Sequence, residues 1–380
     1  MKIDGSAGLY IHIPFCKTKC PYCDFYSITC HDSLTGYPDL LIGEMEMYRE
    51  RFSSFDTIYL GGGTPSLIGG EVLTRILEKV RSSFHIPERT EITVEVNPDD
   101  VGPTLLDAWR RAGVNRISLG IQSFDDRHLE FLGRRHDGSS SVAAIGMVSD
   151  TGFENLGIDL IFGFHGQTMD DWRDALEKAA GLRPSHISCY QMTIEKGTPM
   201  GRMLKEGSIT SPGEDIQHDM FVLASEFLIS RGYLHYEVSN FALGEKNISR
   251  HNSRYWNHTP YLGLGPSAHS FDGRSRWWNH RDLDLYSSMI LDGELPVEGR
   301  EDLSEDQLRL ERLYFGFRTL RGNDFGDIQS GKNGGELLEK LIAGALVTVE
   351  NGRAIPTIRG MLFADRLPVM VVSGTLSLDQ

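Results

Sequence analysis

The chain has 380 residues, of which 40% are hydrophobic and 24% are charged, and its formal net charge is -15 at pH 7. This length allows two or more domains, and the composition is that of a folded globular protein and excludes a disordered chain. The acidic balance argues against nucleic acid as a main partner, because phosphate binding needs a basic face.

The cysteine count and the hydropathy pattern bear on the compartment. Three of the five cysteines are bunched, so they do not form a disulfide framework, and we expect a reducing environment. The first residues contain no long apolar run, and no later stretch approaches the length of a membrane span. We therefore expect a cytoplasmic protein without a signal peptide or a transmembrane segment, for which peripheral contact with a membrane stays open.

Short β-branched and apolar runs alternate with longer stretches of helical period in the first half of the chain. This alternation is typical of βα units around a parallel sheet, and about six such strand runs are present. Gly113 and Gly152 follow two of the helical stretches, where a C-terminal stop is expected. The predicted strands cover 9–14, 57–61, 91–96, 116–121, 156–162 and 186–192, and the predicted helices cover 40–52, 73–84, 104–112, 141–151 and 170–182.

The pattern changes after the sixth strand. A helix is expected over 211–232, and from residue 303 onward we expect a helix over 305–320, a glycine-rich break over 321–335 and a helix over 336–346. Asn351-Gly352, between two apolar runs of 347–357, is a hairpin signal. Helices followed by a hairpin resemble a winged-helix unit, for which the acidic composition favours a packing or acceptor-docking role over DNA binding.

Three cysteines, Cys16, Cys20 and Cys23, lie in the loop after the first predicted strand. A four-iron, four-sulfur cube has four corners, so three cysteines leave one iron open for a substrate or cofactor. Zinc is the alternative, but structural zinc sites are closed by four protein ligands and no second Cys-x-x-Cys pair exists here. His12 or His31 would have to supply the fourth ligand.

Polar residues stand at or just after the end of every predicted strand. In a parallel α/β barrel the active-site groups project from these ends, so a recurrence in phase indicates one site, although a single such residue is more often a cap or a turn former. The glycine run 61–63 is expected to leave backbone amides free for a carboxylate or phosphate, or else to form a tight turn. The polar groups are Gly61-Gly62-Gly63-Thr64-Pro65 after the second strand, Glu95 and Asn97 at the third, Gln122 and Ser123 at the fourth, Asp159 on the fifth, and Gln191 and Thr193 at the sixth.

Three charged residues suit particular ligand groups. Glu95 and Asp159 suit ribose hydroxyls or an amino group, and Arg134 suits a carboxylate. Each has a plainer interpretation as a surface or salt-bridged charge, which we favour for Arg134 because it lies in a polar loop.

Together these features resemble a known family. The three-cysteine motif, with Tyr10 before it and 61–65 after it, is similar to the radical S-adenosylmethionine (SAM) superfamily. Further phrases at 95–98, 120–124, 158–161 and in His251-Asn252-x-x-Tyr255-Trp256 resemble the branch that contains the oxygen-independent coproporphyrinogen III dehydrogenases and the HemW-like heme chaperones. The resemblance covers most of the chain.

The resemblance implies a fold of a partial (β/α)6 radical SAM barrel with a C-terminal α+β extension and a small winged-helix-like domain. We place the barrel at 1–235, the extension with the His251 segment at 236–302, and the last domain at 303–380. It further implies that Cys16, Cys20 and Cys23 ligate a [4Fe-4S] cluster whose open iron binds SAM, and that an electron from the cluster cleaves the sulfonium to a 5′-deoxyadenosyl radical. The implied SAM contacts are Tyr10, Gly62 and Glu95 at a first site, Gly63, Thr64, Gln122, Arg134 and Asp159 at a second site, and Thr193 as a further contact.

One residue divides the branch. The dehydrogenases carry another cysteine two positions after the third, where this chain has Phe25, as HemW-like proteins do. This departure favours a chaperone that binds heme and passes it to acceptors such as respiratory enzymes, with an electron donor as a partner if radical chemistry occurs. A porphyrinogen-modifying enzyme and a non-catalytic metal-binding module are the alternatives, and enzymatic activity stays open.

Heme iron needs an axial ligand, and His251 is the candidate because arginines and aromatic residues surround it in the sequence. The alternative for His251 is a hydrogen-bonded structural role. His269 lies in a glycine-rich loop that would approach the cofactor or form a turn. Cys30 and Cys189 lie outside the cluster spacing and are expected to be inert small side chains.

Overall fold

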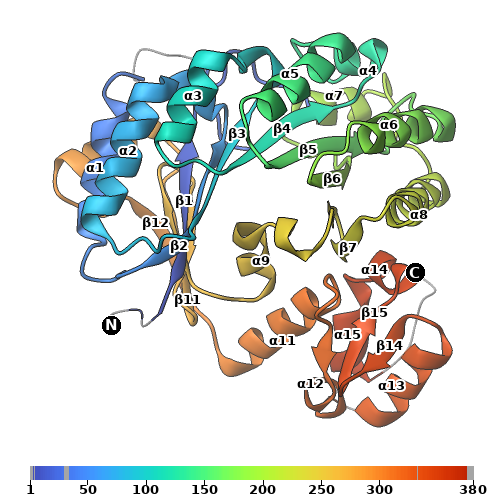
Figure 1. The fold of residues 1–380 in the computed structure, drawn as a ribbon. Helices are drawn as coiled ribbons and strands as arrows, with labels where there is room; N and C mark the ends of the chain where they lie inside the picture. The colour runs from blue at the N-terminus through green and yellow to red at the C-terminus, as the bar shows by residue number, and fades with distance from the viewer. Residues whose placement is uncertain (1–2, 4, 30–33, 332, 375–380) are drawn as a thin grey trace.

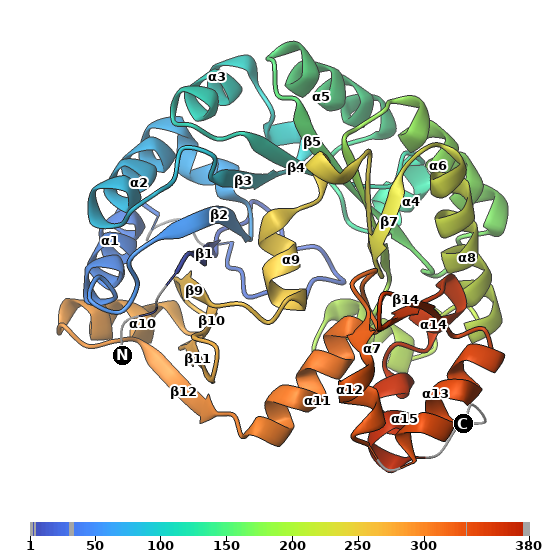
Figure 2. The same ribbon diagram turned by 60° about the horizontal axis from the view of Figure 1, so that its bottom comes forward.

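A computed structural model describes residues 3, 5–29, 34–331 and 333–374. Six parallel strands, each followed by helical structure, form the centre of one large sheet and confirm the predicted α/β partial barrel. The helices cover the outer, convex side of this sheet (Figure 1, Figure 2). The strands are β1 (Ala7–Ile13), β2 (Phe55–Gly62), β3 (Glu91–Val96), β4 (Arg116–Gln122), β5 (Asn155–Phe162) and β6 (His186–Gln191).

The outer helices lie close to the predicted ranges. Gly113 and Gly152 both adopt positive φ after helices, as expected of C-terminal stops, and a capping box between Thr168 and Asp171 starts the helix before β6. The short helices α4 (Asp126–Phe131) and α7 (Pro199–Lys205) were not expected. The others are α1 (Tyr37–Met47), α2 (Gly69–Ser83), α3 (Pro103–Arg111), α5 (Gly138–Asp150), α6 (Met169–Gly181) and α8 (Glu214–Ser230), with 3-10 turns η1 (Pro65–Ile68) and η2 (Pro98–Asp100).

Burial explains why these segments form a barrel wall. The strands carry apolar side chains toward the helices, and the large residues Trp109, Trp172 and Phe162 are fully buried in one continuous core. Polar residues on the opposite side of the strands face the barrel interior. The inner face of the sheet is therefore available for a functional site.

Residues 234–302 lengthen the same sheet at both edges. β8 (Asn240–Ala242) pairs antiparallel with β6, and β7 (Leu234–Glu237) pairs with β8. At the other edge, β9 (Tyr261–Leu264) runs parallel to β1 and is followed outward by β10 (His269–Phe271), β11 (Ser275–Asn279) and β12 (Val297–Asp302). The remaining elements of this region are η3 (Glu245–Asn247), α9 (Arg250–Trp256) and α10 (Leu283–Leu291).

Helix α9 lies inside the arc formed by the parallel strands (Figure 2). Its first amides are those of Arg250 and His251, which donate to the Glu91 carboxylate at 3.1 and 2.9 Å, while the Ser249 side chain caps Asn252. The start of β3 thereby fixes the helix that carries His251.

The C-terminal residues form a small unit with its own core and a three-stranded antiparallel sheet. Asn351 and Gly352 both have positive φ, so the predicted Asn-Gly hairpin is confirmed. The predicted break over 321–335 is only partly correct, because a strand and a short helix form within it. The elements are α11 (Glu305–Gly316), β13 (Asn323–Asp324), α12 (Phe325–Gln329), α13 (Gly334–Ala343), β14 (Val347–Glu350), β15 (Arg353–Pro356), α14 (Ile358–Leu362) and α15 (Arg366–Ser373).

The small unit is tied to the end of the large sheet. The Val238 amide donates to the Arg318 carbonyl at 2.9 Å, and the Leu320 amide donates to the Tyr236 carbonyl at 3.0 Å. The boundaries at 235 and 302 remain predictions.

Candidate functional site

The cysteine loop follows β1 and is closed at its base. The Ile28 amide donates to the Pro14 carbonyl at 2.7 Å, and the Cys16 amide donates to the Ile28 carbonyl at 2.9 Å, which extends the strand pairing past the end of β1. Cys16, Cys20 and Cys23 are all half-buried and line one cavity of about 430 Å³. The structure therefore brings the three predicted thiols to one place at the carboxyl ends of the strands.

Three neighbouring segments hold this loop from outside. The Met200 amide of α7 donates to the Pro21 carbonyl at 2.9 Å. Gly133 packs so closely on Pro21 that a Cβ there would lie 2.6 Å from the proline ring. The Lys17 ammonium lies 2.6 Å from the Asp100 carboxylate at the end of β3. The loop is thus anchored to three parts of the barrel rim.

The glycine run after β2 has a different role from the one expected. The Gly63 amide donates to the Ile13 carbonyl at 2.8 Å, the Thr64 amide donates to the Phe15 carbonyl at 2.7 Å, and the Gly62 amide donates to Glu95 at 3.2 Å. The prediction of free amides is therefore wrong. Glycine is needed because a Cβ at Gly63 would lie 2.6 Å from the Phe15 carbonyl oxygen, so the run lets two backbones meet.

Buried carboxyl groups line the inner wall of the cavity. Glu95 accepts a hydrogen bond from the Tyr59 hydroxyl at 2.6 Å, and burial, followed by repulsion from Asp159, raises its pKa to about 7. The Ser118 hydroxyl donates to Asp159 at 3.2 Å, and burial raises the pKa of Asp159 too. Two acidic groups with raised pKa values suit a ligand that brings an amino group or hydroxyl donors.

Gln122 and Arg134 meet the cavity from β4 and the loop beyond α4. Gln122 has a φ of 68° at a shift in the β4–β5 register, and its buried Oε1 has no hydrogen-bond partner among the described residues. Such an atom needs a donor, which a bound ligand would supply. Arg134 is half-buried and donates to the Gly120 carbonyl at 2.8 Å, so its expected placement as a surface charge is wrong.

Other predicted residues lie at the rim or away from the cavity. Thr193 lines the rim, as does Phe25, whose side chain is 70% exposed. Tyr10 lies beside the site without lining the cavity and pairs its hydroxyl with His12 Nδ1 at 3.0 Å. His12 Nε2 donates to the Tyr26 carbonyl at 2.9 Å, so both its ring nitrogens are used and it is unsuited to a fourth metal ligand.

His251 also has both ring nitrogens engaged. Its Nδ1 lies 2.9 Å from the Thr57 hydroxyl, its Nε2 lies 3.0 Å from the Tyr255 hydroxyl, and the ring stacks on Tyr59. The residue is 1% exposed, and burial lowers its pKa to about 3. Heme ligation by His251 would require one of these hydrogen bonds to break, so the geometry favours the structural alternative, and ligation stays a prediction.

The remaining histidine and cysteine candidates have simple placements. His269 is exposed on β10 and stacks on Trp278. Cys189 is buried in β6, and burial raises its pKa strongly, which confirms an inert side chain. Cys30 and His31 lie outside the described residues.

Sequence reasoning missed an inner layer of the site. Every second residue of a strand faces the same side, so the residues two positions before each strand-end group also point into the barrel. That alternation was the available signal. The missed lining residues include Tyr59, Thr93, Ser118, Ser188 and Tyr190, and at the amino ends of the strands Arg116 and His186, with Ser249 and Asn252 from the start of α9.

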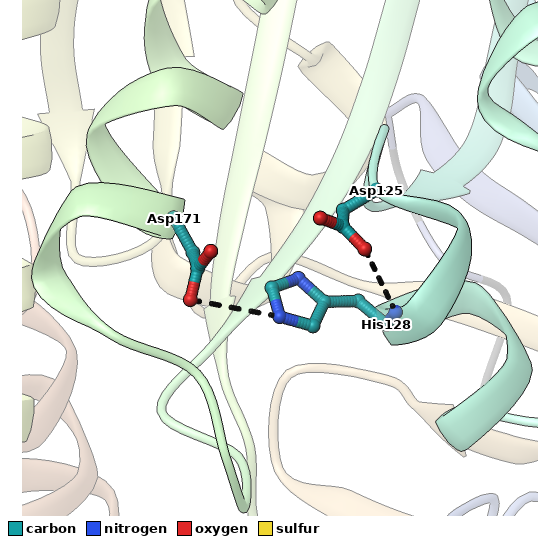
Figure 3. Close-up of side chains that lie close together, drawn as sticks. All are labelled: Asp125, His128 and Asp171. Carbon is teal, nitrogen blue, oxygen red and sulfur yellow. Dashed lines mark hydrogen bonds and ion pairs between the residues drawn. The ribbon is translucent and has the colours of Figure 1, made fainter.

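Asp125, His128 and Asp171 form a separate group whose side chains are of types that bind metal ions (Figure 3). Asp125 accepts the Arg127 and His128 amides at the start of α4, and Asp171 completes the capping box of α6 with Thr168. The Arg127 guanidinium lies 2.8 Å from Asp125 and 3.5 Å from Asp171. Helix capping and this cation account for both carboxylates, so the group ties α4 to α6.

The cavity fits the cofactors that the cysteine spacing implies. Three thiols supply three ligands, and the unpartnered Gln122 Oε1 and Thr93 Oγ1 offer acceptors for a bound molecule. Within the described part of the chain, no helix is both long and apolar enough to cross a bilayer.

Comparison with known proteins agrees with this site. The family model described as radical SAM superfamily matches residues 10–179. The chain is 34% identical over 366 residues to a Mycobacterium tuberculosis protein named heme chaperone HemW, covering 94% of this chain and 93% of the relative. A Bacillus subtilis protein of the same name is 30% identical over 317 residues, covering 82% of this chain and 83% of the relative.

A solved structure shares the fold. The radical SAM enzyme coproporphyrinogen III oxidase (HemN) from Escherichia coli superposes with a TM-score of 0.81 at 22% identity, covering 98% of this chain and 91% of that chain. The barrel and the small C-terminal unit therefore form a known fold. The chain belongs to the radical SAM superfamily, in the family of proteins named heme chaperone HemW.

Proposed function

We propose that this protein is a heme chaperone, which binds heme and transfers it to acceptor proteins, on a radical SAM scaffold with one [4Fe-4S] cluster and SAM. The observation that carries the proposal is the similarity to proteins named heme chaperone HemW over almost their whole length. Phe25, in place of a fourth cysteine of the loop, and the three cavity-lining thiols support it.

The cavity residues take the following roles in the proposal. Cys16, Cys20 and Cys23 would hold the cluster at three corners and would leave the fourth iron open to SAM. Glu95, Gly62 and Tyr10 are proposed as contacts to the SAM bound at that iron. Further SAM contacts are proposed for Gly63, Thr64, Gln122, Arg134, Asp159 and Thr193, of which Gly63 and Thr64 would act without their amides, because these amides are bonded to the chain itself.

When bound, the cluster and SAM supply one-electron chemistry. The chain's own groups bind and orient: Glu95, held by Tyr59, accepts hydrogen bonds from the ligand, and Asp159 is set by Ser118. Helix α7 packs against the cysteine loop at the carboxyl ends of the strands, which reduces the access of water to these groups. An electron donor is required only if the cluster is reduced.

Heme titration tests the carrier function. The protein is purified and reconstituted without oxygen, titrated with heme, and mixed with a heme-free acceptor such as a respiratory enzyme subunit. We expect one heme per chain and transfer that restores the acceptor's heme absorption. A protein that takes up no stoichiometric heme, or that binds heme and never releases it to an acceptor, contradicts the proposal. Bovine serum albumin loaded with heme is the control for passive exchange.

A second candidate is a porphyrinogen-modifying radical SAM enzyme. The observation in its favour is the complete cofactor cavity on a fold shared with the E. coli enzyme. Incubation with coproporphyrinogen III, a reductant and SAM separates the candidates, because decarboxylated product would support the enzyme. A simple metal-binding module is distinguished by metal analysis that finds zinc and no sulfide.

The compartment and the partners belong to the same proposal. A thiol-rich, oxygen-sensitive centre suits the reducing cytoplasm. Acceptors would dock from the cytoplasmic side, with membrane contact limited to the periphery. Fractionation of cells into cytoplasm and membrane, with and without an acceptor complex, tests this placement.

A further inference from the structure

Two of the cavity cysteines receive hydrogen bonds from one continuous network. Arg134 Nη1 donates to Cys20 Sγ at 3.5 Å, and the Thr64 hydroxyl donates to Cys16 Sγ at 3.6 Å. Both distances suit a hydrogen bond to a sulfur acceptor. Asn97 connects the two donors, because its Oδ1 accepts from Arg134 Nη2 and its Nδ2 donates to Thr64 Oγ1 at 3.2 Å.

Asn97 determines the direction of the Thr64 hydroxyl. A hydroxyl has one proton to donate. The Asn97 amide N–H occupies the acceptor side of Thr64 Oγ1, so the Thr64 proton is free to point at Cys16. Thr64 is 4% exposed, which leaves little water to compete for that proton.

Asn97 and Gly120 determine the direction of Arg134. The two Nη2 protons go to Asn97 Oδ1 and to the Gly120 carbonyl, the latter at 2.8 Å. A Cβ at Gly120 would lie 3.3 Å from Nη2, so glycine gives the guanidinium room to sit against β4. With Nη2 held in this way, the rigid plane of the guanidinium carries Nη1 to Cys20.

We propose that Asn97 is a positioning residue that aims the Thr64 and Arg134 donors at the Cys16 and Cys20 sulfurs, and that this network raises the reduction potential of the bound cluster. The inference rests on the proposed [4Fe-4S] cluster and goes beyond it. Hydrogen bonds to cluster sulfurs favour the more negative, reduced state, because they draw charge away from the sulfur.

This role differs from the one that family resemblance implies for Thr64 and Arg134, which is contact with SAM. In the structure, three of the five guanidinium protons are committed to the protein, and the Thr64 hydroxyl has both a donor and an acceptor. The Thr64 and Arg134 side chains therefore bind the cysteine loop.

The test is an EPR-monitored redox titration of the reconstituted protein without SAM. Asn97→Leu keeps the size of the side chain and removes both amide functions. We expect the midpoint potential to become more negative by a shift on the order of 59 mV, which corresponds to a tenfold change in a one-electron equilibrium constant. Thr64→Val removes the hydroxyl that donates to Cys16 and accepts from Asn97, and it leaves the Arg134 donor to Cys20 in place, so we expect a smaller shift in the same direction.

Ser66→Ala is the matched control, because it also deletes one hydroxyl near the loop, and that hydroxyl donates to Asp100 at 3.2 Å and to neither sulfur. Its potential should equal that of the wild type. Unchanged potentials in Asn97→Leu and Thr64→Val overturn the network's role. If Asn97→Leu takes up no cluster, Thr64→Val alone decides by the same criterion. A wild-type protein that takes up no four-iron cluster overturns the proposed cofactor and this inference together, whereas a loaded wild type with insensitive variants overturns only the inference.

Discussion

Replacement of Gly63 by alanine tests the finding that the glycine run exists for close packing of the cysteine loop. The new Cβ would lie 2.6 Å from the Phe15 carbonyl oxygen and 2.8 Å from the Ile13 carbonyl oxygen, well inside the 3.4 Å of ordinary contact. Both obstacles are backbone atoms, so no side-chain rotation relieves them. The strand end and the glycine run must separate, which weakens the Gly63–Ile13 and Thr64–Phe15 hydrogen bonds.

The expected loss of stability follows from these contacts. Overpacking costs about 1–3 kcal/mol, and each of the two weakened backbone hydrogen bonds adds about 0.5–1.5 kcal/mol, so we expect Gly63→Ala to lower the free energy of unfolding by roughly 2–6 kcal/mol. Because the loop carries the three thiols, iron bound per chain after reconstitution should fall as well.

Urea unfolding of the apo-protein and iron and sulfide analysis of the reconstituted protein measure the two effects. Gly146→Ala in α5 is the matched control, since a Cβ there meets nothing within 4 Å and should stabilise the helix slightly. A Gly63→Ala protein with wild-type stability and a full cluster would refute the packing argument and restore the idea that the run serves a ligand.

Three further substitutions give distinct outcomes. Burial raises the pKa of Glu44 from 4.5 to about 7, so the folded state holds the proton more tightly, and the free energy of unfolding falls by about 3 kcal/mol between pH 4.5 and 7. Urea unfolding of Glu44→Gln should lack this fall, and a variant with the wild-type pH slope contradicts the prediction. His251→Phe leaves the buried Thr57 hydroxyl without its partner and should cost about 1–3 kcal/mol in unfolding, while the heme spectrum stays as in the wild type; a changed spectrum would make His251 a heme ligand. Phe25→Ser removes a side chain that is 70% exposed, so unfolding should change by less than about 0.5 kcal/mol and iron content should stay constant; lost iron would give Phe25 a structural role in the loop.

Sequence periodicity predicted the parallel core of the fold because its strands are short, apolar and buried by one layer of helices. The six strands and the Asn-Gly hairpin were therefore recoverable. The edge strands β7 to β12 were not, because their pairing depends on contacts between distant parts of the chain. Helix α9 likewise has an ordinary sequence, and contacts with distant strands, such as those to Glu91 of β3 and Thr57 of β2, explain its place inside the barrel.

The site divides in the same way. Strand-end position and cysteine spacing predicted the thiols and the strand-end polar residues of the cavity, including Glu95, Gln122 and Asp159, but not its inner layer. What each group does there depends on partners from other strands. The Gly63 amide is bonded to the end of β1, the Gly62 amide is bonded to Glu95, and Arg134 donates to both Cys20 and Asn97, which no local pattern reveals.

Three cysteines are proposed to hold a cluster with one open iron that faces the cavity. Mössbauer spectroscopy of anaerobically reconstituted protein, before and after addition of SAM, tests it most directly. We expect four irons per chain, one of which changes its signal when SAM binds. A cluster whose irons are all unaffected by SAM, or a site that takes up only zinc, would contradict the account.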